Sequence, residues 1–290
     1  MSSLFRLSHP FHLFLAALTY LLGAGMAHYL GKPFIAAAFW LGALWGLTLF
    51  FAAYLLAEYF RSPAEPLGDA ESPRQRSRLR TLLLQVSAAA LVLATAFTIV
   101  MLYSRVLTLP AVLFLILIFI LLMAYALPPL RLANSGYGEL TLTVFLADFL
   151  PVLAFLLQTG EFHRLLLVVT FPLTFLALAY LIVCDFPTFA SDQKYARLTL
   201  LVRLTWQRTV PLHHILIIIA YALFASVPLL GLPWRVFWPV FLTFPLALMQ
   251  ILWLRNITLG AKPLWRLLEA NAAAVFGLTV YILVFTFWVR

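Results

Sequence analysis

The feature of this sequence that most restricts its fold is a series of long apolar runs that are almost free of charged residues. A helix rises about 1.5 Å per residue, so about 20 apolar residues are needed to cross the roughly 30 Å hydrocarbon core of a bilayer. Runs of about this length lie at residues 12–29, 35–57, 81–103, 109–127, 140–157, 163–184, 212–231, 236–254 and 271–288. The sequence therefore predicts a protein that crosses the bilayer nine times.

Helices are the expected form of these spans. Inside lipid, every backbone polar group must be paired within its own segment or around a closed barrel, and none of the runs alternates apolar and polar residues as barrel strands do. Only 10% of the 290 residues are charged and 64% are hydrophobic, whereas about a quarter of the residues in soluble domains are charged. We expect an all-α polytopic membrane protein. Residues 1–290 are predicted to form a single domain, because no long polar linker divides the chain.

The distribution of lysine and arginine predicts the orientation of the spans, because these residues are retained on the cytoplasmic side during insertion. With the N-terminus inside, fourteen of the 19 basic residues fall in cytoplasmic segments and five face outward. The longest cytoplasmic segments are residues 58–80, 185–211 and 255–270. Topology and anionic lipid headgroups account for the net charge of +9, so no nucleic-acid partner is expected. The predicted location is the cell (inner or plasma) membrane.

Two pairs of acidic residues stand at the cytoplasmic ends of the second and sixth spans. Glu58 and Glu65 are seven residues apart, as are Asp185 and Asp192. Seven residues is close to two helical turns, so we expect each pair to share a helix face and the two faces to confront one another. Carboxylate oxygens suit a hard divalent ion, and Mg²⁺ commonly bridges one or two carboxylates to phosphate oxygens. The alternative is that these are ordinary hydrated helix ends.

Basic residues flank both acidic pairs. Arg61 lies between the two glutamates, and Lys194 and Arg197 follow Asp192. Guanidinium and ammonium groups in these positions are suited to binding a diphosphate. The two segments therefore predict a site for a metal ion and a diphosphate.

The placement of these acids resembles the UbiA superfamily of intramembrane prenyltransferases. That family has nine membrane helices and two motifs of the form NDxxDxxxD on cytoplasmic loops after helices two and six. Here the corresponding segments read AEYFRSPAE from Ala57 to Glu65 and CDFPTFASD from Cys184 to Asp192. The resemblance covers essentially the whole chain, and it implies nine helices around a central cavity open to the cytoplasmic side.

The loop between the fourth and fifth spans is similar to that of the naphthoate branch of the family. It reads YALPPLRLANSGYGEL from Tyr125 to Leu140, and QTGE at residues 158–161 is also similar. The resemblance implies that Tyr125 and Arg131 contact the diphosphate or the acceptor from a cap over the cavity.

The sequence departs from the family pattern at four positions. Ala57 and Arg61 replace the Asn and middle Asp of the first motif, and Cys184 and Thr188 replace those of the second. Threonine hydroxyls bind Mg²⁺ in nucleotide hydrolases, so Thr188 is a candidate ligand. The implied metal ligands are Glu58, Glu65, Asp185, Asp192 and Thr188.

The resemblance implies an enzyme that transfers an isoprenyl group from a prenyl diphosphate to an aromatic acceptor, such as a quinone precursor, with Mg²⁺ as cofactor. Asp185 and Asp192 are the expected catalytic residues, while Arg61, Lys194 and Arg197 neutralise the diphosphate. A second hypothesis is a non-catalytic relative that binds prenyl lipids or assembly partners, which the two lost acids favour. A transporter is a weaker third hypothesis, because the sequence shows no pair of broken helices in matching halves of the chain beyond the repeated acidic spacing.

Overall fold

The computed structural model describes residues 9–62, 65–66 and 72–289. Within this part of the chain, nine helical stretches are apolar and long enough to cross a membrane: Pro10–Tyr29, Ala36–Tyr59, Arg74–Tyr103, Leu109–Ala126, Gly138–Thr159, Arg164–Asp185, Trp206–Leu230, Trp234–Thr258 and Trp265–Val289. They match the predicted spans in number and order, so the all-α fold with nine membrane helices is confirmed. Most boundaries agree within two or three residues.

Several spans are built from more than one helical element. The elements are α2 (Pro10–Tyr29), α3 (Ala36–Tyr59), α4 (Pro73–Tyr103), α5 (Leu109–Ala126), η1 (Leu132–Asn134), α6 (Gly138–Val144), η2 (Phe145–Phe149), α7 (Leu150–Thr159), α8 (Arg164–Asp185), α9 (Phe189–Lys194), α10 (Leu200–Leu204), α11 (Trp206–Ser226), η3 (Val227–Leu230), α12 (Trp234–Phe237), η4 (Trp238–Thr243), α13 (Phe244–Thr258) and α14 (Trp265–Val289). The fifth span thus runs through α6, the π-helical turn η2 and α7. The eighth runs through α12, η4 and α13.

The third span begins earlier than its apolar run. Ser72 caps α4 by accepting a hydrogen bond from the backbone N–H of Gln75, and the Gln75 side chain bonds back to the Ser72 N–H. This reciprocal capping box, with Pro73 at the first helical position, satisfies donors that a helix start would otherwise leave unpaired. The arginines at residues 74–80, which belong to the predicted cytoplasmic segment 58–80, are therefore helical and extend α4 beyond its apolar run.

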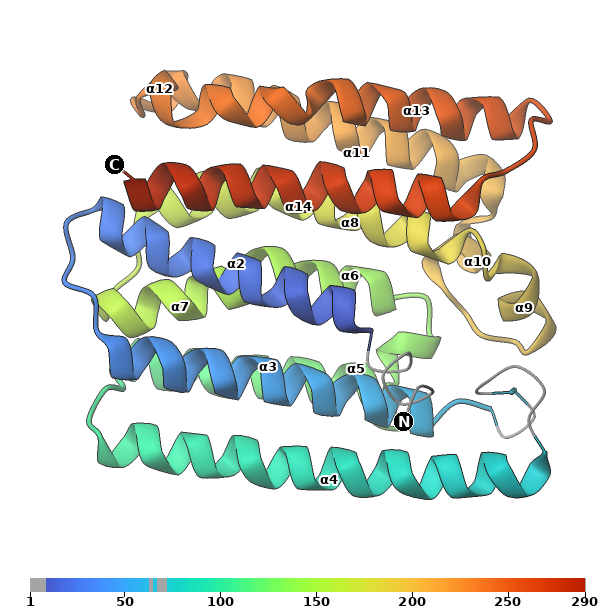
Figure 1. The fold of residues 1–290 in the computed structure, drawn as a ribbon, viewed down its shortest axis with the longest axis horizontal. Coiled ribbons are helices and arrows are strands. Elements are labelled where there is room, and N and C mark those ends of the chain that lie inside the picture. Colours follow the sequence, from blue (N-terminus) through green and yellow to red (C-terminus); the bar gives the residue numbers. More distant parts are fainter. Residues whose placement is uncertain (1–8, 63–64, 67–71, 290) are drawn as a thin grey trace.

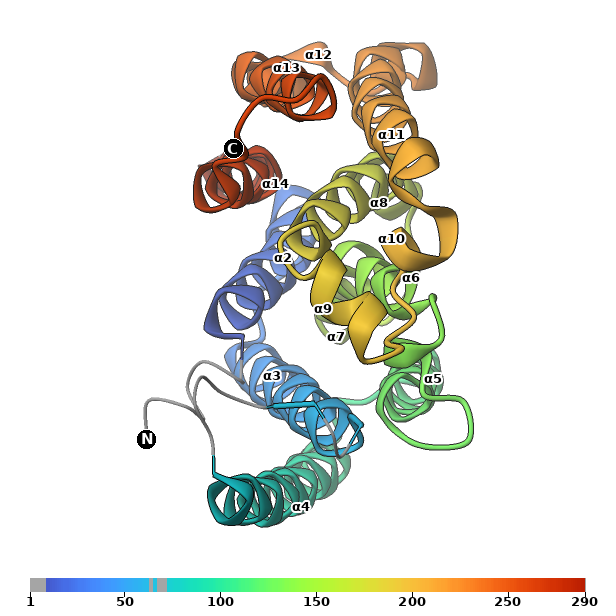
Figure 2. The same ribbon diagram turned by 90° about the vertical axis from the view of Figure 1, so that its right-hand side faces the viewer.

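The long helices lie side by side, and the short helices α9 and α10 lie at one end of them (Figures 1 and 2). Helix α3 packs along α4, α2 packs on α7, and α14 packs on both α2 and α8. One hydrophobic core includes residues from all nine spans. This packing brings the ends of α3 and α8 to the same end of the bundle.

The contact between α2 and α7 depends on a glycine. A Cβ atom at Gly23 would stand 2.0 Å from the backbone oxygen of Pro151, far inside van der Waals contact. Small residues that let helix backbones approach closely are typical of membrane helix interfaces, where lipid removes most of the hydrophobic driving force. Gly23 therefore sets the separation of these two helices.

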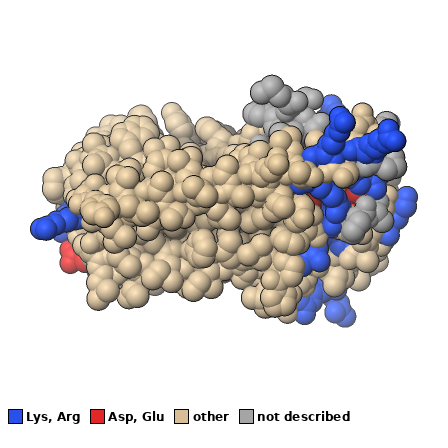
Figure 3. Space-filling view, turned by 90° about the horizontal axis from the view of Figure 1, so that it is seen from below, with Lys and Arg blue, Asp and Glu red and all other residues tan. Residues whose placement is uncertain are grey.

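Lysine and arginine side chains gather at the end of the bundle that carries α9 and α10, while the visible middle is uncharged (Figure 3). The uncharged middle agrees with a hydrocarbon environment. The charged end matches the end predicted to face the cytoplasm, and that orientation stays a prediction.

Candidate functional site

A cavity of about 1060 Å³ lies at the charged end of the bundle, between the ends of α3 and α8 and the starts of α2, α6 and α14. This volume is at the upper end of the range of about 300–1,000 Å³ typical of small-molecule sites. Its wall contains six carboxylates and three guanidinium groups. They belong to Glu58, Glu65, Glu139, Asp185, Asp192 and Glu269, and to Arg61, Arg197 and Arg266.

Both acids of the first acidic segment form ion pairs with an arginine of the same segment, Arg61. Helix α3 ends at Tyr59, so Glu58 lies in its last turn and Glu65 lies beyond it. The Arg61 guanidinium contacts Glu58 at 2.7 Å and Glu65 at 3.2 Å. The prediction that Glu58 and Glu65 share a helix face is wrong, because the helix stops between them. Both carboxylates nevertheless line the cavity, and Arg61 joins them.

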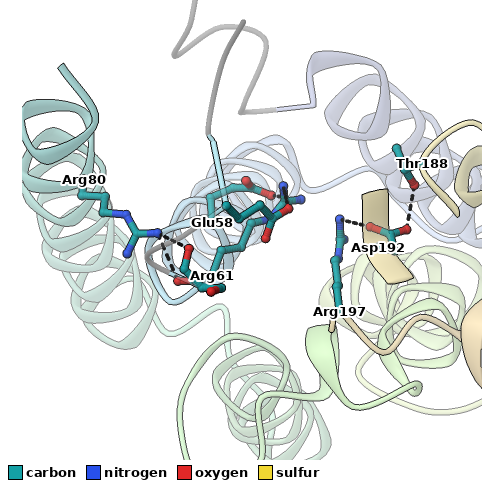
Figure 4. A network of polar contacts seen from close by, with 8 residues as sticks. Glu58, Arg61, Arg80, Thr188, Asp192 and Arg197 are labelled. Atoms are coloured by element: carbon teal, nitrogen blue, oxygen red, sulfur yellow. Dashed lines mark hydrogen bonds and ion pairs between the residues drawn. The ribbon is translucent and has the colours of Figure 1, made fainter. Parts of the chain in front are cut away.

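The second acidic segment also changes direction between its two acids. Asp185 ends α8, and Asp192 lies in the separate short helix α9, so this pair does not share one helix face either. The Thr188 hydroxyl donates a hydrogen bond to Asp192 at 2.8 Å, and Arg197 lies 3.6 Å from the same carboxylate. Figure 4 shows the Asp192 group and the Arg61 group coming from different elements. Both line the same cavity.

Two further arginines fix the end of α3 without lining the cavity. Arg80 of α4 donates to the carbonyl oxygens of Arg61 at 3.2 Å and Ser62 at 2.6 Å (Figure 4). Arg131 donates to the carbonyl oxygen of Phe60. Carbonyls at a helix C-terminus have no partner within the helix and carry partial negative charge, so cations are stabilising there. These contacts hold the first acidic segment in place.

Only some of the predicted diphosphate-binding residues line the cavity. Arg61, Arg197 and Tyr125 line the cavity, as do all five predicted metal ligands. Arg131 contacts the end of α3 instead. Lys194 is exposed, and its ammonium group lies over the ring of Tyr195 at 5.3 Å.

Burial and neighbouring charges perturb the ionisable groups of the loops. Burial raises the pKa of Asp192, although Arg197 and the Thr188 hydrogen bond oppose the shift. Burial lowers the pKa of Arg197, but the carboxylates of Glu58, Asp192 and Asp185 outweigh it and leave the pKa above its ordinary value. Arg197 is therefore a permanent cation beside the cavity.

Glu139 is a site residue that the motif analysis missed. It lies in the first turn of α6, is 7% exposed and lines the cavity. Its carboxyl group is an electrostatic neighbour of Asp185, which lines the same cavity from α8. Among the described cavity carboxylates, Glu139 Oε2, Asp185 Oδ2 and Glu58 Oε2 are buried without a hydrogen-bond partner, and of these three acids only Glu58 forms an ion pair. The GYGEL segment that resembles the naphthoate branch contains this glutamate, so the resemblance was the sequence signal that could have identified Glu139 as a site residue.

The donor set suits a cation that arrives with its substrate. Within the described ranges, no three Asp, Glu, His or Cys side chains converge as a ready-made metal cage. Mg²⁺ does not need one, because it keeps several waters and is usually held by one or two carboxylates plus substrate phosphates. The unpaired oxygens of Asp185 and Glu139 therefore fit Mg²⁺ in the presence of a diphosphate.

An aromatic wall adjoins the charged part of the cavity and was also missed from the sequence. His9 stacks on Tyr54 with ring centroids 5.0 Å apart, and the Tyr54 hydroxyl lies 2.7 Å from His12 Nδ1. Tyr125 and Tyr180 complete this wall. Burial, with Arg61 and Arg197 nearby, lowers the pKa of His9 to about 4, so its imidazole is neutral at pH 7.

Solved structures of UbiA homologues have the same fold. One from Archaeoglobus fulgidus has a TM-score of 0.64 at 15% identity, over 99% of this chain and 100% of that chain. The structure of a UbiA homologue from the same organism bound to GPP and Mg²⁺ has a TM-score of 0.57 at 15% identity, with the same coverage. The apo structure of a homologue from Aeropyrum pernix K1 has a TM-score of 0.55 at 14% identity, over 96% of this chain and 97% of that chain.

No family model and no curated protein matches the sequence. The structural likeness extends over 99% of this chain and 100% of that of the Archaeoglobus fulgidus homologue. The fold that the two acidic segments indicated is therefore confirmed: this chain has the fold of the UbiA homologues.

Proposed function

We propose that this protein is a membrane prenyltransferase of the UbiA superfamily. It transfers an isoprenyl group from a prenyl diphosphate to an aromatic, quinone-precursor-like acceptor, with Mg²⁺ as cofactor. The observation that carries the proposal is the cavity itself, in which carboxylates and guanidinium groups at the end of α3 and α8 adjoin a wall of aromatic rings. A solved UbiA homologue of the same fold is bound to GPP and Mg²⁺, which supports this assignment.

The charge of the cavity supports a metal-bound diphosphate. The wall contains six carboxylates and three guanidinium groups, so acidic groups outnumber basic ones. A diphosphate is itself an anion, and its repulsion by this wall is strong in surroundings of low dielectric constant. Divalent cations remove that repulsion. When bound, Mg²⁺ neutralises charge on the leaving diphosphate.

The residues of the chain then have distinct roles. Arg61 and Arg197 are placed to donate N–H groups to diphosphate oxygens. The C–O bond of the prenyl diphosphate breaks, and the diphosphate leaves with the electron pair. The faces of Tyr54, Tyr125 and Tyr180 stabilise the positive charge of the allylic carbon. A ring carbon of the acceptor bonds to that carbon, and the ring then loses a proton, for which the neutral imidazole of His9 is a suitable acceptor.

The acceptor class rests on the loop that joins α5 to α6. The segment from Tyr125 to Leu140 resembles the naphthoate branch of the family, and its Tyr125 and Glu139 side chains line the cavity. Aromatic rings of the wall offer stacking surfaces for a planar acceptor. We therefore propose an aromatic acceptor of the naphthoate type.

The decisive test uses the purified chain with Mg²⁺, a series of prenyl diphosphates and candidate aromatic acids, and it measures diphosphate release. We expect Mg²⁺-dependent release, reduced about tenfold or more by Asp185→Asn and by Asp192→Asn. Full activity in both variants would remove these carboxylates from the mechanism.

The non-catalytic alternative has its own supporting observation. Arg61 already forms ion pairs with both acids of the first segment, so such a site can hold a prenyl diphosphate without activating it. Binding of a prenyl diphosphate without any diphosphate release, across the whole acceptor series, would favour a prenyl-lipid-binding protein over an enzyme.

A further inference from the structure

The carboxylates of the cavity differ in whether they already have a cation partner. Arg61 lies 2.7 Å from Glu58 and 3.2 Å from Glu65, and both of these acids are buried. A divalent ion that bound there would have to displace a guanidinium from two ion pairs at once. The first acidic segment is thus already occupied by a positive group of its own.

Two of the remaining acids also have basic partners. Asp192 accepts a hydrogen bond from Thr188 and lies 3.6 Å from Arg197. Glu269 is one turn from Arg266 on α14 and is attracted by it. Each of these carboxylates therefore already has a basic neighbour.

Asp185 and Glu139 are different, because neither forms an ion pair with a basic residue in the described part of the chain. Both line the same cavity, from α8 and from α6, which pack together. Asp185 Oδ2 and Glu139 Oε2 are buried without a hydrogen-bond partner. Two ionised carboxylates that line one cavity repel each other, and a divalent cation bound by both relieves that repulsion. Arg197 attracts Asp185, but the ion pair that it forms is with Asp192.

We infer that the site holds a single divalent cation, bound by Asp185 and Glu139, and that Arg61 takes the place of a cation at the first acidic segment. Glu139 thereby supplies a second carboxylate ligand, in place of the middle aspartate that Thr188 replaces in the second motif. Two carboxylates with diphosphate oxygens and waters make a complete Mg²⁺ environment. Arg61 has five N–H donors and uses only some of them on Glu58 and Glu65, so others can reach the diphosphate. This inference rests on the proposed function.

The test counts metal ions rather than turnover. The full chain in detergent micelles is mixed with a prenyl thiolodiphosphate, whose C–S bond resists cleavage, and titrated with Mn²⁺ as a substitute for Mg²⁺. Free Mn²⁺ is measured by electron paramagnetic resonance. We expect one Mn²⁺ per chain.

Matched variants separate the two acidic sites. Glu139→Gln should weaken Mn²⁺ binding about tenfold or more, whereas Glu65→Gln, which also removes a cavity carboxylate, should change it less than about twofold. Arg61→Asp should create a second Mn²⁺ site. A thermal unfolding curve shows which variants fold. If Glu139→Gln does not, the Arg61→Asp and Glu65→Gln measurements still decide the question.

Three results would overturn the inference. Two Mn²⁺ ions on the wild-type chain, or equal losses in Glu65→Gln and Glu139→Gln, would place a metal at the first segment while leaving the proposed function intact. A failure of the wild-type chain to bind the thiolodiphosphate at any Mn²⁺ concentration would instead overturn the proposed function, and the inference with it.

Discussion

Replacing Arg61 by methionine removes the guanidinium between Glu58 and Glu65 while keeping a long, flexible side chain. The side chains of Glu58 and Glu65 are only 5% and 9% exposed, and that of Arg61 is 16% exposed. Removing one partner from a buried ion pair costs about 3–5 kcal/mol, because the other charge stays buried and uncompensated. The adjoining cavity admits water, so we expect the lower figure, about 3 kcal/mol.

The expected loss is measurable as a shift in unfolding temperature. At roughly 2–4 °C per kcal/mol for a chain of this size, Arg61→Met should unfold roughly 6–12 °C below the wild type in detergent micelles, followed by circular dichroism. The double variant Arg61→Met/Glu58→Gln should recover part of this loss, because it removes one of the unpaired charges. Arg78→Met, at an exposed position of α4, is the control and should stay within about 0.5 kcal/mol of the wild type.

Two outcomes would refute this reasoning. If Arg61→Met unfolded at the wild-type temperature, the ion pairs would contribute nothing to stability. If the double variant were less stable than Arg61→Met by the full effect of Glu58→Gln alone, the two residues would act independently and the guanidinium would not compensate Glu58.

Three further predictions address other parts of the molecule. Arg197→Met should weaken thiolodiphosphate binding in calorimetry by about tenfold or more, whereas Lys194→Met, at an exposed position outside the cavity wall, should change it less than about twofold. Gly23→Ala should cost about 1–3 kcal/mol in thermal unfolding, because its Cβ would meet the Pro151 oxygen at 2.0 Å. Lowering the pH from 6.5 to 5 should destabilise the wild type more than His9→Asn, by about 1.6 kcal/mol. The reason is that unfolded histidine binds a proton near pH 6.5, whereas folded His9 does so only near its pKa of about 4. Equal pH dependence in both proteins would contradict the lowered pKa.

The membrane spans could be predicted from the sequence because the constraint is local. A segment that crosses lipid must be apolar and helical over about 20 residues whatever its neighbours are. Where the structure differs, a local signal explains it. Helix α4 starts at Pro73 because Ser72 and Gln75 form a capping box. The first residues of the helix are polar, so a search for apolar runs places the start of the span too late.

The geometry of the site was harder to predict from the sequence. A spacing of seven residues indicates a shared face only if one helix continues through it, and both α3 and α8 end between their acids. Pro63 and Pro187 in the sequence are compatible with such breaks. The pairing of Glu139 with Asp185 depends on how α6 packs on α8. No sequence pattern within either helix encodes that contact.

The replacement of an acid by Arg61 is compatible with both a binding role and a purely structural one, and the surroundings of the guanidinium distinguish them. A clamp that served only to hold the end of α3 would duplicate Arg80 and Arg131, which already bind the backbone oxygens there. Arg61 instead contacts side-chain carboxylates on the cavity wall. A buried ion pair contributes little net stability compared with apolar packing, so its position beside a charged cavity is better explained by the anion that the cavity is proposed to bind. On this reasoning, diphosphate binding should suffer more in Arg61→Met than in Arg80→Met, even where the two variants lose the same stability.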